Sequence, residues 1–215
     1  MDSVEKLVVR RPELAAAAPS LRRLIAATVA AFRSGGSFFV AGNGGSGADS
    51  EHICGELLKG FMQKRVLPQS ERAKFAGLFG AEGTDMAAKL QGGLRAISLL
   101  SHPAFGTAFM NDVDADLVYA QQLWALAKKG DVFLGISTGG GSKNVRAALM
   151  AAKVIGVRSF LLTGNKHGVC EKYADEVIAV NESETYLIQE LHLPLYHAFC
   201  TAVEAEMFPE EGEKC

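Results

Sequence analysis

Short apolar runs alternate along the chain with longer stretches in which apolar residues recur at helical spacing. The runs occupy residues 38–41, 96–100, 132–136, 157–162 and 176–180, and the main helical stretches occupy residues 21–32, 48–61, 112–129, 143–155 and 185–207. Uninterrupted apolar runs are typical of strands covered on both faces, and their alternation with helices indicates βαβ units. The pattern therefore predicts an α/β fold in which a parallel sheet lies between two helical layers.

The N-terminal part, residues 1–34, is expected to be a helical extension. Residues 1–19 carry little pattern, but Ser20 is a suitable N-cap for the helical stretch behind it. Gly35 and Gly36 end that helix. We expect its apolar stripe to pack in the core or to mediate oligomerisation.

Residues 62–95 read as an inserted loop with one short helix from Thr84 to Leu90, and residues 103–111 read as a loop. An excursion of this length inside a compact domain is usually functional or mobile. Three basic side chains in or just before it, Lys59, Lys64 and Arg65, could supply positive charge to a substrate. A solvated surface is the favoured interpretation for these three.

Composition limits the class of protein. The 215 residues are 48% hydrophobic and 21% charged, which suits one globular domain over residues 1–215 and excludes a disordered or fibrous chain. A formal net charge of −2 gives no reason to expect nucleic acid as a partner. The chain shows no secretory signal, no apolar run near the ~20 residues of a membrane helix, and no CxxC pair among its four cysteines. We therefore expect reduced thiols, no membrane and a cytoplasmic location.

Two loops rich in glycine and serine each join a predicted strand to a predicted helix, at residues 42–47 and 137–142. Such a junction presents free backbone N–H groups and the positive end of a helix dipole to an anion. Neither loop has the GK[ST] ending of a P-loop or a dinucleotide fingerprint with its acidic partner. One such loop could be an ordinary tight turn, but two at equivalent positions of a parallel sheet favour a phosphate monoester as ligand.

His52 and Glu56 lie four residues apart on the helix after the first loop, so both can reach one ion. A pair of this kind is most often a surface hydrogen bond. Its position shortly after the proposed phosphate loop makes a metal or acid–base site more plausible. The last predicted helix adds four further polar side chains, Gln189, Glu190, His192 and His197.

Three stretches together carry a specific resemblance: GNGGS after the first strand, GDVFLGISTGGGS, and QELHLPLYH in the last helix. They resemble the sugar isomerase (SIS) domain family, with its flavodoxin-like fold, and within it the phosphoheptose isomerases, which act on sedoheptulose 7-phosphate. The similarity runs from about residue 35 to residue 207 and is interrupted by residues 62–95. It implies an aldose–ketose isomerase, a homotetramer with interfacial sites, and one zinc ion per subunit.

The resemblance also assigns roles position by position. It implies zinc ligation by His52, Glu56, Gln189 and His197, with Glu56 and His197 as the acid–base pair. It leaves His192 as a structural histidine. The substrate contacts that it implies are Asn43, Gly44, Gly45, Ser46, Glu56, Asn111, Asp112, Ser137, Thr138, Gly139, Ser142 and Gln189.

Two features depart from the family pattern or strain it. Gly139 stands where the family usually has a third hydroxyl, so the phosphate contacts are weakened or reshaped. Gln189 and His197 are eight residues apart, which is about 12 Å along an ideal helix and about 80° around it. Convergence on one ion requires full reach, a bend at Pro194, or residues from two subunits.

Two other functions stay open. One SIS relative binds the replication initiator protein without catalysis and has small or amide residues where Glu56 and His197 stand here; the ending Glu206-Met207-Phe208-Pro209 is similar to it. The presence of Glu56 and His197 favours an enzyme. The other alternative is an isomerase of a different sugar phosphate.

Overall fold

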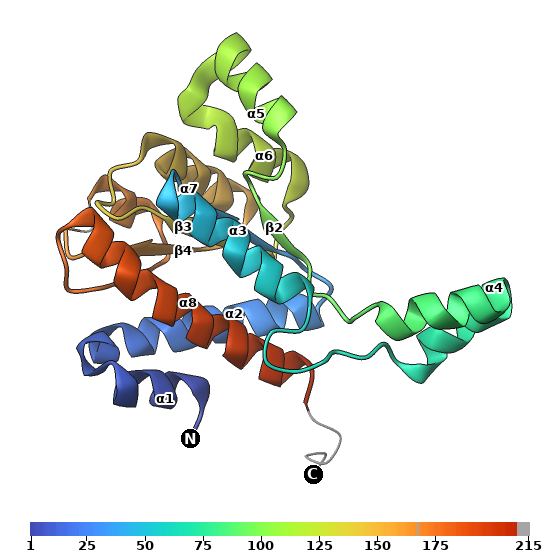
Figure 1. Ribbon diagram of the computed structural model, residues 1–215. Coiled ribbons are helices and arrows are strands. Elements are labelled where there is room, and N and C mark those ends of the chain that lie inside the picture. The colour runs from blue at the N-terminus through green and yellow to red at the C-terminus, as the bar shows by residue number, and fades with distance from the viewer. Residues whose placement is uncertain (167, 210–215) are drawn as a thin grey trace.

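The computed structural model, which describes residues 1–166 and 168–209, contains one five-stranded parallel sheet (Figure 1). Its strands are β1 (Phe38–Ala41), β2 (Ala96–Ser98), β3 (Val132–Ile136), β4 (Arg158–Thr163) and β5 (Glu176–Ala179). They lie in the order β2-β1-β3-β4-β5, with Phe39 opposite Phe133. The order changes direction between β1 and β3, as in flavodoxin-like folds. The predicted parallel sheet is confirmed.

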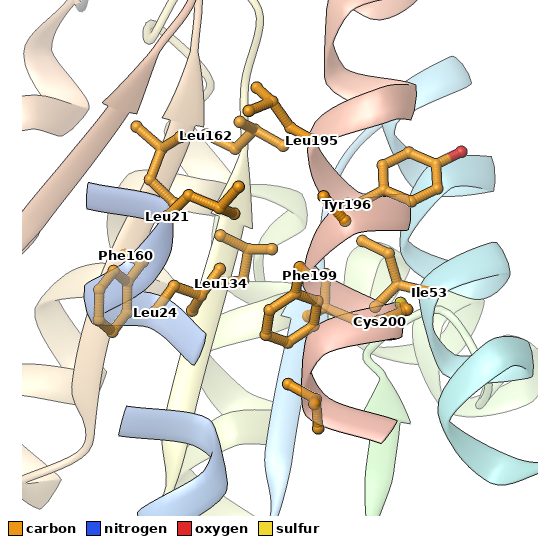
Figure 2. Packing of buried hydrophobic residues seen from close by; sticks show 14 of the residues in the cluster. Leu21, Leu24, Ile53, Leu134, Phe160, Leu162, Leu195, Tyr196, Phe199 and Cys200 are labelled. Atoms are coloured by element: carbon orange, nitrogen blue, oxygen red, sulfur yellow. The ribbon is translucent and has the colours of Figure 1, made fainter. Parts of the chain in front are cut away.

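Alternate residues of each strand face two separate cores. Phe38 and Val40 pack with the layer formed by α1 (Ser3–Arg10), α2 (Ala18–Arg33), α3 (Gly45–Leu58) and α8 (Thr185–Met207). Figure 2 shows this core, with side chains from α2, α3 and α8 meeting over β3 and β4. Phe39 and Ala41 pack with α6 (Val118–Leu126) and α7 (Lys143–Ile155) on the other face. The chain is therefore the expected three-layer sandwich.

The N-terminus is more ordered than its pattern predicts. Helix α1 begins with a reciprocal capping box in which Glu5 N donates to Asp2 Oδ1 at 2.8 Å and Asp2 N donates to Glu5 Oε2 at 2.9 Å. Its residues Val4 and Leu7 are buried. A 3₁₀ turn (Pro12–Ala17) joins it to α2, which starts before the expected cap at Ser20.

One helical stretch, Pro12–Arg33, is long and apolar enough to cross a membrane by length and composition alone. This differs from the expectation that no such stretch exists. Leu21 and Leu24 are nevertheless 2% exposed, because this segment covers the sheet and packs against α8. The apolar character of this stretch is explained by its position as a core helix.

The insertion differs most from expectation. Residues Gln69–Lys89 form α4, in which Gly80 adopts φ 58° and folds the helix back on itself as a hairpin. The hairpin projects away from the body (Figure 1). Its neck is closed by a bridge between Val66 and Gln91 and by a 2.7 Å bond from Gly92 N to the Arg65 carbonyl. The predicted short helix from Thr84 is only the second arm.

The region before β3 is also more helical, and more broken, than predicted. The loop expected at 103–111 is mostly helix α5 (Pro103–Phe109), with proline at its start. The single helix expected at 112–129 is divided into a π-helical turn (Met110–Asp114), a 3₁₀ turn (Ala115–Leu117) and α6. Asp114 has extended backbone angles, which interrupts the helix there.

Arg65 does not lie on a solvated surface. Its side chain is 0% exposed and is paired with Glu204 of α8, which is 1% exposed, at 2.8 Å. Arg65 also donates to the carbonyls of Glu56 and Leu57 at the end of α3, at 3.0 and 2.7 Å. Glu204 accepts from the backbone N–H groups of Phe61 and Met62. A buried ion pair thus joins α3, α8 and the start of the insertion.

Three cysteines, Cys54, Cys170 and Cys200, are free and buried. Burial raises the pKa of Cys54 to about 12, which disfavours the reactive thiolate. A short 3₁₀ helix (Val169–Tyr173) carries Cys170. Cys215 and most of the acidic C-terminal end lie outside the described residues.

Candidate functional site

The two glycine–serine loops meet at the point where the strand order reverses. One follows β1 and the other follows β3, and ligands of open α/β sheets bind at such switch points. The loops are tied together by two reciprocal amide hydrogen bonds of 2.9 Å between Asn43 and Asn144. Tyr119 Oη donates to the Gly42 carbonyl at 2.7 Å and lies 3.1 Å from Asn43 Oδ1. Sequence reasoning missed Asn144 and Tyr119, since neither lies in a loop motif.

The second loop presents hydroxyls at the start of α7. Ser137 Oγ and Ser142 Oγ lie 2.9 Å apart, and the Ser142 N–H approaches Ser137 Oγ at 3.4 Å. The Thr138 carbonyl is already engaged, because it accepts from Gly164 N at 2.9 Å. A Cβ built at Gly139 would meet nothing within 4 Å. The missing third hydroxyl is therefore not imposed by crowding.

The first loop contacts the side chain of Gln189. Gly44 has φ 55°, a left-handed value that glycine tolerates, and α3 starts at the next residue. A Cβ on Gly45 would lie 2.5 Å from Gln189 Nε2, so any other residue at this position would displace the amide from where it lies. Ser46 is 4% exposed. Gln189 of α8 thus lies beside the N-terminus of α3.

A second cluster lies further along α3 and α8, where the predicted His–Glu pair meets the last helix. His52 Nε2 is 3.2 Å from Glu56 Oε1, and Lys59 Nζ donates to Glu56 Oε2 at 3.1 Å. The rings of His52 and His197 are nearly perpendicular, with centroids 5.2 Å apart. The structure therefore brings His52, Glu56 and His197 together within one chain.

Tyr196 completes this cluster from α8, where Figure 2 shows it pointing toward α3. Its hydroxyl lies 3.0 Å from His52 Nδ1 and donates to Asp49 Oδ1 at 3.2 Å. Burial raises the pKa of Tyr196 well above its usual value, and the Asp49 charge adds to this effect. Sequence reasoning missed Tyr196 and Asp49, although both are close in sequence to predicted site residues.

Burial also shifts the pKa values of the two histidines of α8. It lowers the pKa of His197, and nearby His52 lowers it further, while Glu56 opposes the shift. The net effect favours the neutral form of the His197 imidazole. His192 is 0% exposed, and burial lowers its pKa to about 4. This agrees with a structural role for His192.

The cluster fits a metal ion in the chemistry of its donors. Imidazole nitrogens and a carboxylate are usual zinc ligands. His197 Nε2 is buried and has no hydrogen-bond partner among the described residues, so no protein group there competes with an ion for this nitrogen. No group of three or more His, Cys, Asp or Glu side chains within residues 1–166 and 168–209 is arranged as a metal site, however, and zinc stays a prediction.

The remaining predicted residues lie elsewhere in the chain. Gln189 contacts the first loop, two helical turns before His197. Asn111 and Asp112 are exposed in the π-helical turn after α5, where Asn111 Nδ2 donates to Asp112 Oδ1 at 2.9 Å. The contacts found within the described part of this chain do not bring them to either loop.

A cavity of about 440 Å³ opens beside His197. Its walls come from α1, from the segment after α3 and from α8. They include Ser3, Lys6, Arg10, Phe61, His197 and Thr201. Because α1 has no clear sequence signal, this basic wall was not predicted.

No family model matches the chain. It is 34% identical over 193 residues to the phosphoheptose isomerase of Crocosphaera subtropica, covering 90% of this chain and 85% of that one. It is 36% identical over 191 residues to the phosphoheptose isomerase of Pelobacter propionicus, covering 88% and 87%.

Among solved structures, the phosphoheptose isomerase of Neisseria gonorrhoeae matches with a TM-score of 0.69 and 27% identity, covering 94% of this chain and 89% of that one. The phosphoheptose isomerase of Francisella tularensis matches in fold, with a TM-score of 0.71, 24% identity and 93% of each chain covered. These likenesses extend over nearly the whole chain.

Proposed function

The chain belongs to the phosphoheptose isomerase family, and from this premise we propose that it interconverts sedoheptulose 7-phosphate and glycero-manno-heptose 7-phosphate. The observation that carries the proposal is the cluster of His52, Glu56 and His197 between α3 and α8. It lies along the same helix that begins at the first switch-point loop. The site thus has an anion-binding end and an end with acid–base groups.

The reaction moves a proton between C1 and C2 of the sugar through an enediol. Glu56 is the proposed base for the carbon-bound proton, since its carboxylate is fixed between His52 and Lys59. His197 is the proposed partner that exchanges a proton with the carbonyl oxygen. Burial lowers the pKa of His197 and so favours its neutral imidazole, which is the form that can accept a proton.

The phosphate is proposed to bind the two loops. Hydroxyls of Ser137, Thr138 and Ser142, backbone N–H groups and the N-terminus of α7 would contact its oxygens. Binding energy from this remote group would orient the reacting carbons. Asn43, Gly44, Gly45, Ser46, Gly139 and Gln189 are assigned to the substrate on their place in or against the loops, and Asn111 and Asp112 on the resemblance alone.

A zinc ion is proposed to be held by His52, Glu56, His197 and Gln189. When bound, it would supply Lewis-acid polarisation of the substrate oxygens. The fit rests on the donor types and on the unpartnered His197 Nε2. The separation of Gln189 from His197 along α8, about 12 Å, supports a site completed between copies of a homotetramer. A cytoplasmic location is proposed with it.

The test is turnover of sedoheptulose 7-phosphate by protein purified with zinc, after chelation, and after zinc is restored. We expect turnover that chelation abolishes and zinc restores. A panel of shorter ketose phosphates decides whether a different sugar is the better substrate. Absence of turnover by zinc-loaded protein on every sugar phosphate in the panel refutes the isomerase. No contact in the described residues favours the non-catalytic binding function.

A further inference from the structure

Behind His52 lies a short line of hydrogen bonds that ends at a carboxylate. His52 Nδ1 is 3.0 Å from Tyr196 Oη, and Tyr196 Oη is 3.2 Å from Asp49 Oδ1. A carboxylate only accepts, so the single hydroxyl proton of Tyr196 goes to Asp49. The Tyr196 oxygen is then left as an acceptor for the proton on His52 Nδ1. The direction of both bonds is therefore set by Asp49.

This direction determines which ring nitrogen of His52 carries a lone pair. With the proton on Nδ1, the lone pair lies on Nε2, which is 3.2 Å from Glu56 Oε1. Two acceptors at this distance are satisfied together only by a proton or a cation between them. The arrangement thus turns the metal-binding nitrogen toward the carboxylate.

We propose that Tyr196 and Asp49 are positioning residues that fix the tautomer of His52, so that Nε2 is free to bind a cation together with Glu56. The inference rests on the proposed metal-assisted isomerase. Partners that hold the second nitrogen of a ligating histidine commonly orient the ring and raise its basicity. Neither residue is expected to touch the substrate.

In the described part of the chain, the hydroxyl of Tyr196 makes no hydrogen bond other than these two. Tyr196 is 3% exposed, and a buried tyrosine hydroxyl needs hydrogen-bond partners. The two found are His52 and Asp49. The ring itself packs edge-on against His52 and His197, with centroids 5.4 and 5.1 Å away. A phenylalanine at this position would keep the packing and lose only the two hydrogen bonds.

The experiment reads the tautomer directly, in metal-free protein labelled with ¹⁵N-histidine, with the His52 signal identified from a His52→Gln variant. We expect the proton on Nδ1 of His52 in the unmodified protein. Tyr196→Phe should remove the preference. Asp49→Ala should reverse it, because the freed hydroxyl can then donate to Nδ1. Asp49→Asn keeps a carbonyl acceptor and should restore the original tautomer.

Zinc affinity and turnover are measured on the same proteins. We expect Tyr196→Phe and Asp49→Ala to weaken zinc binding by about 10- to 100-fold. With saturating zinc, kcat should fall while KM for the sugar phosphate stays within about twofold. Tyr186→Phe, an exposed tyrosine on the same helix, is the matched control and should leave the His52 tautomer and zinc affinity unchanged.

Each result bears on one proposal. An Nδ1 without a proton in the unmodified protein, or an unchanged Nδ1 proton and unchanged zinc affinity in Asp49→Ala, overturns the positioning role even when the enzyme is active. Zinc-loaded protein without turnover refutes the isomerase, whereas the tautomer measured without metal still decides the hydrogen-bond direction. If Tyr196→Phe does not fold, Asp49→Ala alone carries the test.

Discussion

At the scale of single residues, Glu56 illustrates how neighbours hold a carboxylate in one place. Its side chain is 14% exposed and lies between His52 Nε2 and Lys59 Nζ. Replacing it by glutamine keeps the size and removes the basic oxygen. We expect Glu56→Gln to lower kcat by about 10²- to 10⁴-fold, because positioned acid–base groups contribute rate factors of that order.

The affinity for inorganic phosphate should change little in Glu56→Gln, since the serine loop lies on other elements; titration calorimetry measures it. Glu51→Gln, an exposed glutamate on the same helix, provides the control and should turn over substrate like the unmodified protein. Normal turnover by Glu56→Gln would contradict the assigned role.

Because His192 is buried, we expect the free energy of unfolding to depend on pH. Its pKa is about 4 in the folded chain, against about 6.5 when unfolded. As pH falls, the unfolded state binds the proton first, so the stability present above pH ~6.5 is lost toward pH ~4, by about 3 kcal/mol. Urea unfolding at several pH values measures this slope. His192→Leu should flatten it, and an unchanged slope would exclude His192 as its source.

The sequence predicted the catalytic candidates better than their surroundings. Spacing alone placed His52 and Glu56 on one helical face. The resemblance to the sugar isomerase family added His197 of the last helix. Tyr119, Tyr196 and Asn144 were missed because their contacts join residues 76 to 144 positions apart. Such contacts follow from tertiary packing, which periodicity along the chain does not encode.

At the scale of elements, the buried Arg65–Glu204 pair fastens the end of α3 to α8. Arg65→Met would leave Glu204 as an unpaired buried charge, and removing one partner of such a pair costs about 3–5 kcal/mol. Thermal and urea unfolding measure the loss. Lys64→Met, at an exposed neighbour, should change stability by less than about 0.5 kcal/mol. Equal stability of the two variants would show that the pair contributes nothing.

Elements with a buried apolar pattern were predicted, and those without one were not. All five strands were found because continuous apolar runs mark strands covered on both faces. Helix α1 buries only Val4 and Leu7, and the described residues of α5 include none that are buried. The turn at Gly80, which folds α4 into two arms, depends on one backbone conformation that the sequence does not reveal.

At the scale of the whole molecule, the α4 hairpin stands apart from the sandwich. Its buried residues are Gly83, which lies against Phe75 and Phe79 of the first arm, and Ala87, which lines a small cavity between the two arms. Replacing residues 69–89 by a short glycine–serine linker should therefore change the free energy of unfolding of the body by less than about 1 kcal/mol. Urea denaturation checks this, and a large loss of stability would show that the arm supports the sandwich.

Helix α3 also sets a length. Its first residue, Gly45, lies in the first glycine–serine loop, and His52 follows seven residues later, about 10 Å along the axis. A helix held at both ends by α8 does not shorten to meet a smaller molecule. With the substrate bound as proposed, we expect this separation to select for the length of the carbon chain, because a ketose phosphate whose phosphate and carbonyl are too close together would reach only one end of the site.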